Sequence, residues 1–178
     1  MLTVGNEPTK KTLTLEEGKA KFIQAWGALG STWGINRTMA QVHALLLVSH
    51  APLCADAIMQ ELNISRGNAN MNLRALMDWG LVMKEHKPGD RREYFYAEKD
   101  IWKTANMIIA NRKKRELEPV AGILNCLATV EGDGPAVETF QKTIADLKEL
   151  TAVADKMLDR LSKAERIWLI NSFIKMLG

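Results

Sequence analysis

Apolar residues recur every three or four positions along most of the chain, which is the spacing of amphipathic helices. Thr14 and Glu17 have the spacing of a capping box, and Gly30 is placed to end the helix that they would start. Asn36 is expected to cap a second helix that continues to about Ser49. The apolar faces of these helices would be formed by Phe22, Trp26 and Leu29, and by Met39, Val42, Leu46 and Leu47.

The next stretch predicts two short helices joined by a tight turn. Leu53 to Leu62 is expected to form the first helix, Asn63 to Ser65 the turn, and Arg66 to Trp79 the second helix. Two helices separated by so short a turn are typical of a helix-turn-helix. The buried face of the second helix would consist of Ala69, Leu73, Leu76 and Met77.

A basic β-hairpin is predicted directly after these helices. Gly80 is well placed to end the second helix, and Leu81 to His86 is rich in residues that favour strands. Lys87-Pro88-Gly89-Asp90 is a strong turn signal, after which Arg91 to Ala97 returns as a second strand. This order of elements is that of a winged helix-turn-helix.

The remaining sequence predicts helices from Asp100 to about Glu118, from Pro119, from Pro135 to about Leu161, and from Lys163 to Leu177. The pattern leaves open whether Pro119 kinks one long helix or separates two. The helix from Pro135 carries a packing seam of apolar and small residues three and four positions apart, namely Val137, Phe140, Ile144, Leu147, Thr151, Ala154, Leu158 and Leu161.

Together these elements predict a mostly α fold with a small β-hairpin wing, a winged helix-turn-helix with N- and C-terminal dimerisation helices. We expect a mobile tail over residues 1–14, N-terminal helices over 15–50, a DNA-binding unit over 51–98 and a helical dimerisation region over 99–178.

Charge is concentrated in the middle of the chain. The net charge of the whole chain is +3, but Ser65 to Arg115 contains twelve Lys or Arg and six Asp or Glu, which leaves +6 there. This asymmetry favours a polyanion as partner. The sequence lacks an apolar run of membrane-spanning length and a signal-peptide pattern, so we expect a cytoplasmic protein without a membrane partner.

Side chains suited to double-stranded DNA gather on the second helix of the motif and on the hairpin. The major groove admits one α-helix, in which Asn can pair with adenine and Arg with guanine. The predicted contacts on the helix are Ser65, Arg66, Gly67, Asn68, Asn70, Asn72 and Arg74. Those on the wing are Lys84, Lys87, Arg91 and Arg92, with Asp90 orienting one of the two arginines. The alternative is that these residues are only a solvated surface.

The stretch from about Gly34 to Val120 resembles winged-helix transcriptional regulators of the GbsR/MarR type. Its most specific parts are Ser65-Arg66-Gly67-Asn68, Met71-Asn72-Leu73-Arg74, Trp79-Gly80-Leu81-Val82, Gly89-Asp90-Arg91-Arg92 and Lys114-Arg115-Glu116-Leu117-Glu118-Pro119-Val120. The resemblance implies a homodimer that joins through its terminal helices and places two recognition helices on a pseudopalindromic site. It also implies control by a small effector, without identifying it.

Other functions are represented by weaker signals. Trp26 and Trp33 are the candidates for an aromatic cage around a cationic effector, although aromatic residues at helical spacing more often form a core. Cys54 and Cys126 lack neighbours at metal-ligand spacing, so no metal or cofactor is expected; a redox switch at Cys54 stays open. The sequence shows no catalytic constellation, so we expect no enzyme. The competing hypothesis is a winged-helix protein-interaction module without specific DNA binding.

Overall fold

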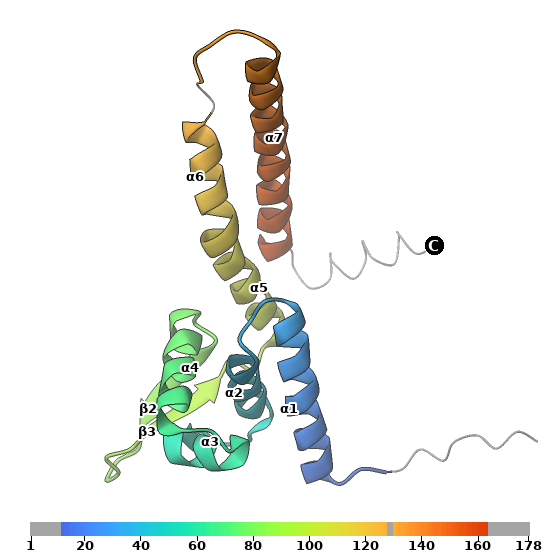
Figure 1. The fold of residues 1–178 in the computed structure, drawn as a ribbon. Helices are drawn as coiled ribbons and strands as arrows, with labels where there is room; N and C mark the ends of the chain where they lie inside the picture. The colour runs from blue at the N-terminus through green and yellow to red at the C-terminus, as the bar shows by residue number, and fades with distance from the viewer. Residues whose placement is uncertain (1–11, 128–129, 164–178) are drawn as a thin grey trace, which may run out of the picture. The chain divides into compact units, whose positions relative to one another are not determined.

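The computed structural model describes residues 12–127 and 130–163, which fall into two compact units (Figure 1). Of the described residues, the first unit comprises 12–78 together with Val82–Ala97, and the second comprises Trp79–Leu81 together with 98–127 and 130–163. The first contains four helices and a three-stranded sheet, and the described part of the second is helical apart from Trp79–Leu81 and the connecting segments. The expectation of a mostly α fold with a small β wing is confirmed.

Helices α1 (Leu15–Thr32) and α2 (Arg37–Val48) pack against each other at the start of the first unit. The predicted capping box is present, because Glu17 and Thr14 each bond to the backbone N–H of the other. Gly30 does not end α1, however. A Cβ at Gly30 would lie 2.6 Å from the Cβ of Ala40, so this glycine allows α1 and α2 to approach closely.

Helices α3 (Ala55–Leu62) and α4 (Arg66–Asp78) form the helix-turn-helix. The prediction that the first of them starts at Leu53 is wrong, because Leu53–Cys54 forms a short strand, β1. Strands β2 (Val82–His86) and β3 (Glu93–Ala97) form the wing, and β1 pairs antiparallel with β3 through Leu53 and Phe95. The sheet therefore has the strand order β1-β3-β2 and is broader than the predicted hairpin.

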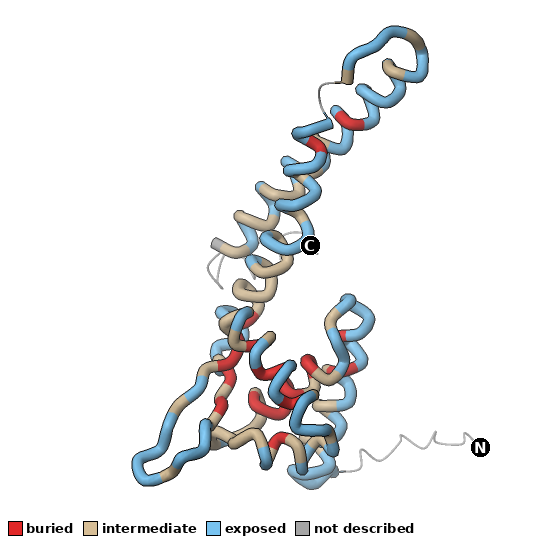
Figure 2. The backbone as a smooth tube through the Cα atoms, turned by 60° about the vertical axis from the view of Figure 1, so that its left-hand side comes forward, coloured by how far each residue is buried: buried red, intermediate tan, exposed pale blue. Residues whose placement is uncertain are grey.

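The core of the first unit lies between α2, α3 and α4. Its largest fully buried side chains are those of Val42, Leu46, Ile58, Leu73 and Leu76. Buried backbone is concentrated in this unit, whereas α6 and α7 are largely intermediate or exposed (Figure 2). Burying such residues stabilises the fold by about 1.5–3 kcal/mol each, which holds α4 in a fixed orientation against its neighbours.

The second unit contains α5 (Ile101–Arg112), the π-helical turn η1 (Lys113–Leu117), α6 (Glu118–Cys126) and α7 (Pro135–Lys163). Pro119 therefore neither separates two helices nor ends one. An α-helix would require Pro119 to bond the carbonyl of Arg115, which proline cannot do and its ring would obstruct. The wider turn η1 just before it, in which the N–H of Glu118 bonds the carbonyl of Lys113, lets the helical backbone continue.

Two expected segments fall outside the described residues: the tail over 1–14, except for its last three residues, and the last helix after Lys163. Within the described ranges, no helix combines the length and the apolarity needed to span a membrane. Gly132 and Gly134 lie in the non-helical segment just before α7, and both have positive φ angles, of 135° and 105°.

Candidate nucleic-acid interface

The turn of the helix-turn-helix is fixed by backbone chemistry. Asn63 adopts the left-handed conformation with φ 51°, which residues other than asparagine and glycine rarely tolerate. The N–H of Ile64 then bonds back to the carbonyl of Met59 at 3.1 Å and closes α3. Ser65 caps α4 as predicted, because its Oγ accepts the N–H of Asn68 at 3.3 Å.

Helix α4 separates its two faces as the spacing predicts. Ala69, Leu73 and Leu76 are buried in the core of the first unit. Five residues on the other side are exposed: Arg66, Gly67, Asn70, Met71 and Arg74. Helix α4 thus presents two guanidinium groups and one amide to solvent, together with a methionine that is 59% exposed.

Asn72 is the one predicted contact on α4 that the structure removes from this face. It is only 3% exposed, and its Nδ2 donates to the carbonyl of Asn68 at 2.8 Å and to the Oδ1 of Asn68 at 2.6 Å. A buried amide satisfied in this way is not available to a base. Because Asn72 occupies the Oδ1 of Asn68, the half-buried Asn68 retains its Nδ2 as the group free to donate outward.

Arg66, at the start of α4, already has an anionic partner. Its Nη2 lies 2.7 Å from Oδ1 of Asp56 on α3, and both side chains are more than half exposed. Such an exposed pair contributes little to stability, but it orders the arginine at the helix N-terminus. A phosphate approaching α4 would compete with Asp56 for this guanidinium.

The wing is organised around Asp90 in the turn between β2 and β3. Asp90 accepts hydrogen bonds from the backbone N–H, Nε and Nη2 of Arg92 and from the hydroxyl of Tyr94. The side-chain and backbone bonds from Arg92 hold the pKa of Asp90 well below its ordinary range. The hydrogen bond that the Tyr94 hydroxyl donates to Asp90 raises the pKa of Tyr94. Of the two arginines that Asp90 was expected to orient, it therefore orients Arg92.

The other cations of the wing differ in how far they are engaged. Lys84 pairs with Glu93 across the two strands at 2.8 Å, and Lys87 lies over the ring of Tyr94, 4.0 Å from its centroid. Arg91 is exposed and has no ion-pair partner in the part of the chain that the structure describes. Arg91 could therefore bind an anion without first giving up an ion pair seen in the described residues.

Tyr94 is the member of the wing that the sequence interpretation missed. It was counted only as a strand former, yet it connects three of the wing's charged residues: Asp90, Lys87 and Arg92. A signal was present, because Asp90, Arg92 and Tyr94 are two residues apart and therefore share one side of an extended chain.

Comparison with known proteins identifies this region. Residues 33–93 match the model of the MarR family. The matched segment starts just before α2 and ends at the first residue of β3, and it includes all eleven residues predicted to contact DNA. Residues 33–93, called the MarR segment below, are therefore similar to the MarR family, and they contain the helix-turn-helix and most of the wing.

A solved structure described as "Crystal Structure of a transcriptional regulator" has the same fold, with a TM-score of 0.63. The similarity covers 82% of this chain and 97% of that chain at 19% sequence identity. It therefore extends beyond the MarR segment, although at this identity it speaks for the fold alone. No curated protein matches the chain.

Trp26 and Trp33 lie outside and at the edge of the MarR segment. The ring of Trp26 lies 5.5 Å from that of Phe22 and 6.4 Å from that of His43, in the packing of α1 and α2. Trp33 is the C-cap residue of α1 and is 56% exposed. The two indoles come from positions two helical turns apart, roughly 10 Å along the axis.

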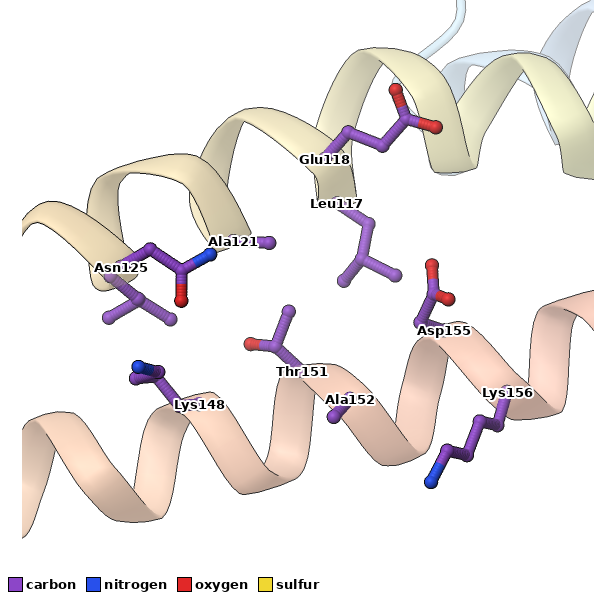
Figure 3. A pocket seen from close by; sticks show the side chains of 10 residues that line it. Leu117, Glu118, Ala121, Asn125, Lys148, Thr151, Ala152, Asp155 and Lys156 are labelled. Carbon is purple, nitrogen blue, oxygen red and sulfur yellow. The ribbon is translucent and has the colours of Figure 1, made fainter.

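The second unit has a groove of about 300 Å³ between α6 and α7. Leu117 and Thr151 point toward each other across it, and Glu118 and Lys156 turn away from it (Figure 3). Small side chains, Ala121 and Ala152, create the space. The groove lies outside the MarR segment.

Proposed function

We propose that this chain is a cytoplasmic, sequence-specific transcriptional repressor of the GbsR/MarR type that binds a pseudopalindromic operator as a homodimer and responds to a small effector. The observation that carries the DNA-binding part is the exposed face of α4, where Arg66, Asn70 and Arg74 stand together beside a basic wing. This face lies within the MarR segment, and the solved structure with the same fold is described as a transcriptional regulator.

In this proposal α4 is the recognition helix. Asn70 and Arg74 are one helical turn apart on the exposed face, so both can reach base edges of one major groove. Asn68 donates its Nδ2 to an acceptor at the rim, and Arg66 exchanges Asp56 for a backbone phosphate. Ser65 and Gly67 contribute backbone N–H groups at the N-terminus of the helix, where the helix dipole favours an anion.

The wing supplies contacts to the adjacent minor groove or its phosphates. Arg91 is the leading residue there, because its guanidinium is exposed while Arg92 is held by Asp90. Lys84 and Lys87 add positive charge along the hairpin, each already engaged with one neighbour on β3. Arg92 and Asp90 thus set the shape of the turn that presents Arg91.

Homodimerisation is supported by an apolar side of the α6–α7 hairpin. On α7, Leu147, Leu150, Met157 and Leu161 are 40–64% exposed and fall within an arc of about 80° beside the buried Ile144. On α6 and at its C-cap, Val120, Ile123 and Leu127 are 37–61% exposed and form a similar arc beside the buried Leu124. Because the two helices are antiparallel, both arcs lie on the same side of the hairpin. An exposed apolar surface of this extent is typical of an interface, and a second copy would cover it.

The experiment is selection of bound sequences from a random duplex pool by the purified protein at two salt concentrations. The proposal expects an inverted repeat at both, and affinity that falls steeply with salt because bound counterions are released. Replacing Arg66, Asn70 and Arg74 with alanine should abolish selection without unfolding the protein, whereas Lys21→Ala, an exposed α1 cation outside the face, should not. Retained selection in the triple variant would contradict this assignment of the recognition helix.

The second candidate is a protein-interaction module, favoured by the same apolar side of α6 and α7. It predicts no enrichment of any duplex and no salt-dependent binding. The effector part of the proposal, with Trp26 and Trp33 as its candidates, is tested after an operator is known, by titrating small cations against the complex. Release that persists when Trp33 is replaced by alanine would remove Trp33 from the effector site.

A further inference from the structure

The short segment between the recognition helix and the wing belongs to the second unit. Trp79–Leu81 directly continues α4, which ends at Asp78, and directly precedes β2, which begins at Val82. Both elements proposed to contact DNA are therefore joined by peptide bonds to three residues that pack with the C-terminal helices. Whatever holds these three residues determines where α4 ends and where the wing begins.

This segment is held by one side chain of α5, one side chain of η1 and one backbone hydrogen bond from Glu98. The Nδ2 of Asn111 donates to the carbonyl of Trp79 at 3.0 Å and also to the carbonyl of Met107 at 2.9 Å. The guanidinium of Arg115 lies over the indole of Trp79, 5.3 Å from its centroid. The carbonyl of Leu81 accepts the N–H of Glu98 at 3.1 Å.

Gly80, between Trp79 and Leu81, has φ +73°, a backbone conformation that residues with a Cβ rarely adopt. A Cβ there would also lie 2.8 Å from the terminal methyl of Met107. The segment is thus a tight, left-handed turn that fits closely against α5, which restricts how it can move.

We propose that Asn111 and Arg115 are positioning residues for DNA recognition, because by holding Trp79 they fix the C-terminal end of α4. The π-helical turn η1 determines whether Arg115 reaches Trp79. This inference rests on the proposed function. Losing one of these contacts to Trp79 can weaken DNA binding by no more than the free energy of that contact. Bound DNA would then have to order the end of α4, which the contact orders in the free protein. A partly exposed cation–π contact and one hydrogen bond correspond to about two- to tenfold each.

The turn η1 connects this contact to α7. Arg115 on Trp79 is in the same five-residue turn as Lys113, which lies 3.0 Å from Asp155 and 2.5 Å from Asp159 on α7. The last residue of the turn, Leu117, lines the groove between α6 and α7, as does Asp155 (Figure 3). A change in α7 or in the groove therefore reaches Trp79 through one short turn. Because Pro119 excludes ordinary α-helical bonding to the Arg115 carbonyl, the π-helical turn holds Arg115 at the position from which it reaches the indole.

The test compares Arg115→Ala and Asn111→Ala with Lys114→Ala in the full-length protein. Lys114 is exposed, lies in the same turn and has no partner among the described residues, so its replacement removes the same charge without touching Trp79. Two quantities are measured: amide hydrogen exchange of the last turn of α4 and Trp79–Leu81 in the free protein, and affinity for the selected operator at several salt concentrations.

The proposal expects faster exchange in this segment for Arg115→Ala and Asn111→Ala, and affinity about two- to tenfold weaker for each, with the salt dependence of wild type. Unchanged exchange, or exchange raised equally by Lys114→Ala, would overturn it. Weaker binding with a reduced salt slope in Arg115→Ala alone would also overturn it, because Arg115 would then be a phosphate contact. If the wild type selects no DNA, the proposed function fails and the exchange measurement alone decides whether the two residues hold Trp79.

Discussion

Asn72 donates both to the backbone carbonyl and to the side-chain Oδ1 of Asn68, one turn earlier on α4. The two asparagines are therefore a pair with one inside and one at the surface. The buried member fixes which atom the surface member presents. An isolated reading of the sequence treats them as equivalent donors, but in the fold only Asn68 keeps a free amide.

A double-mutant cycle should detect this pair. Asn72→Ala is expected to lower the free energy of unfolding by about 1–2 kcal/mol, because a buried hydrogen-bonded amide is lost. Asn68→Ala should cost less on its own, and the double variant should cost less than the sum of the two. Urea denaturation of the four proteins measures the coupling. Strict additivity would show that the pair does not act as a unit.

Release of Arg66 from Asp56 should strengthen DNA binding. Asp56→Asn removes the acceptor that phosphate must displace, so operator affinity is expected to rise about two- to fivefold at low salt, while the free energy of unfolding changes by less than about 1 kcal/mol. Fluorescence anisotropy with a labelled operator measures the affinity. Glu61→Gln is the control, because it removes one negative charge from the same helix at an exposed position. Equal gains in both variants would show a general charge effect.

Close packing of α1 on α2 predicts opposite results for two glycines of one helix. Gly30→Ala should lower the free energy of unfolding by about 1–3 kcal/mol, because its Cβ would meet that of Ala40. Gly18→Ala should raise it by about 0.5–1 kcal/mol, since nothing lies within 4 Å and alanine is the better helix former. Thermal and urea denaturation test the pair. Similar effects of both changes would contradict the close approach of the two helices.

The apolar side of the hairpin predicts where a dimer can be broken. Leu150→Asp combined with Met157→Asp should convert the protein to a monomer, because both side chains are more than 60% exposed and would bring charge into the interface. Ala145→Asp introduces one aspartate on the opposite side of α7 and should leave a dimer. Sedimentation velocity distinguishes these cases. A double variant that remains a dimer would place the interface elsewhere.

The wing should keep its structure over a wide acidic range. The fold lowers the pKa of Asp90 below its ordinary value of 3.8. The ionised carboxylate therefore contributes its full stabilisation at any pH above 3.8, and this contribution is lost only as the pH falls through the lowered pKa. The Arg92 Nε–H signal in NMR spectra is therefore expected to persist unchanged from pH 7 to pH 4.5. Asp90→Asn should shift this signal and the NMR signals of the Tyr94 ring at every pH in that range. Loss of the signal in wild type between pH 5 and 6 would contradict the bonding described.

Much of the fold was predictable because the sequence marks it locally. Caps at Thr14, Asn36 and Ser65 and the spacing of buried residues on α4 each act within one or two helical turns. The roles that escaped prediction depend on contacts distant in sequence. Leu53 was assigned to a helix because its strand exists only through pairing with Phe95, and Gly30 was read as a helix end because its neighbour Ala40 belongs to another helix.

The candidate site divides in the same way. The exposure of Arg66, Asn70 and Arg74 follows from helical periodicity, and periodicity predicted it. Asn72 sits on the boundary between faces, where a rotation of some tens of degrees decides between solvent and core, and no pattern carries that precision. The seam predicted on α7 also divides, because Ile144 is buried while Leu147 and Leu161 remain exposed.

The turn η1 fixes the phase between the two ends of the long helical segment. In an α-helix each residue advances about 100° around the axis, so the wider turn delays everything after Leu117 relative to α5. Rewinding Lys113–Leu117 as ordinary α-helix, with no residue removed, would bring Pro119 into conflict with the backbone before it. It would also turn Ile123 and its apolar neighbours by about a quarter of the circumference relative to Asn111. The winding of this single turn thus determines an angle around the helix axis. That angle separates the apolar face that would join two copies from the residues that hold the recognition helix.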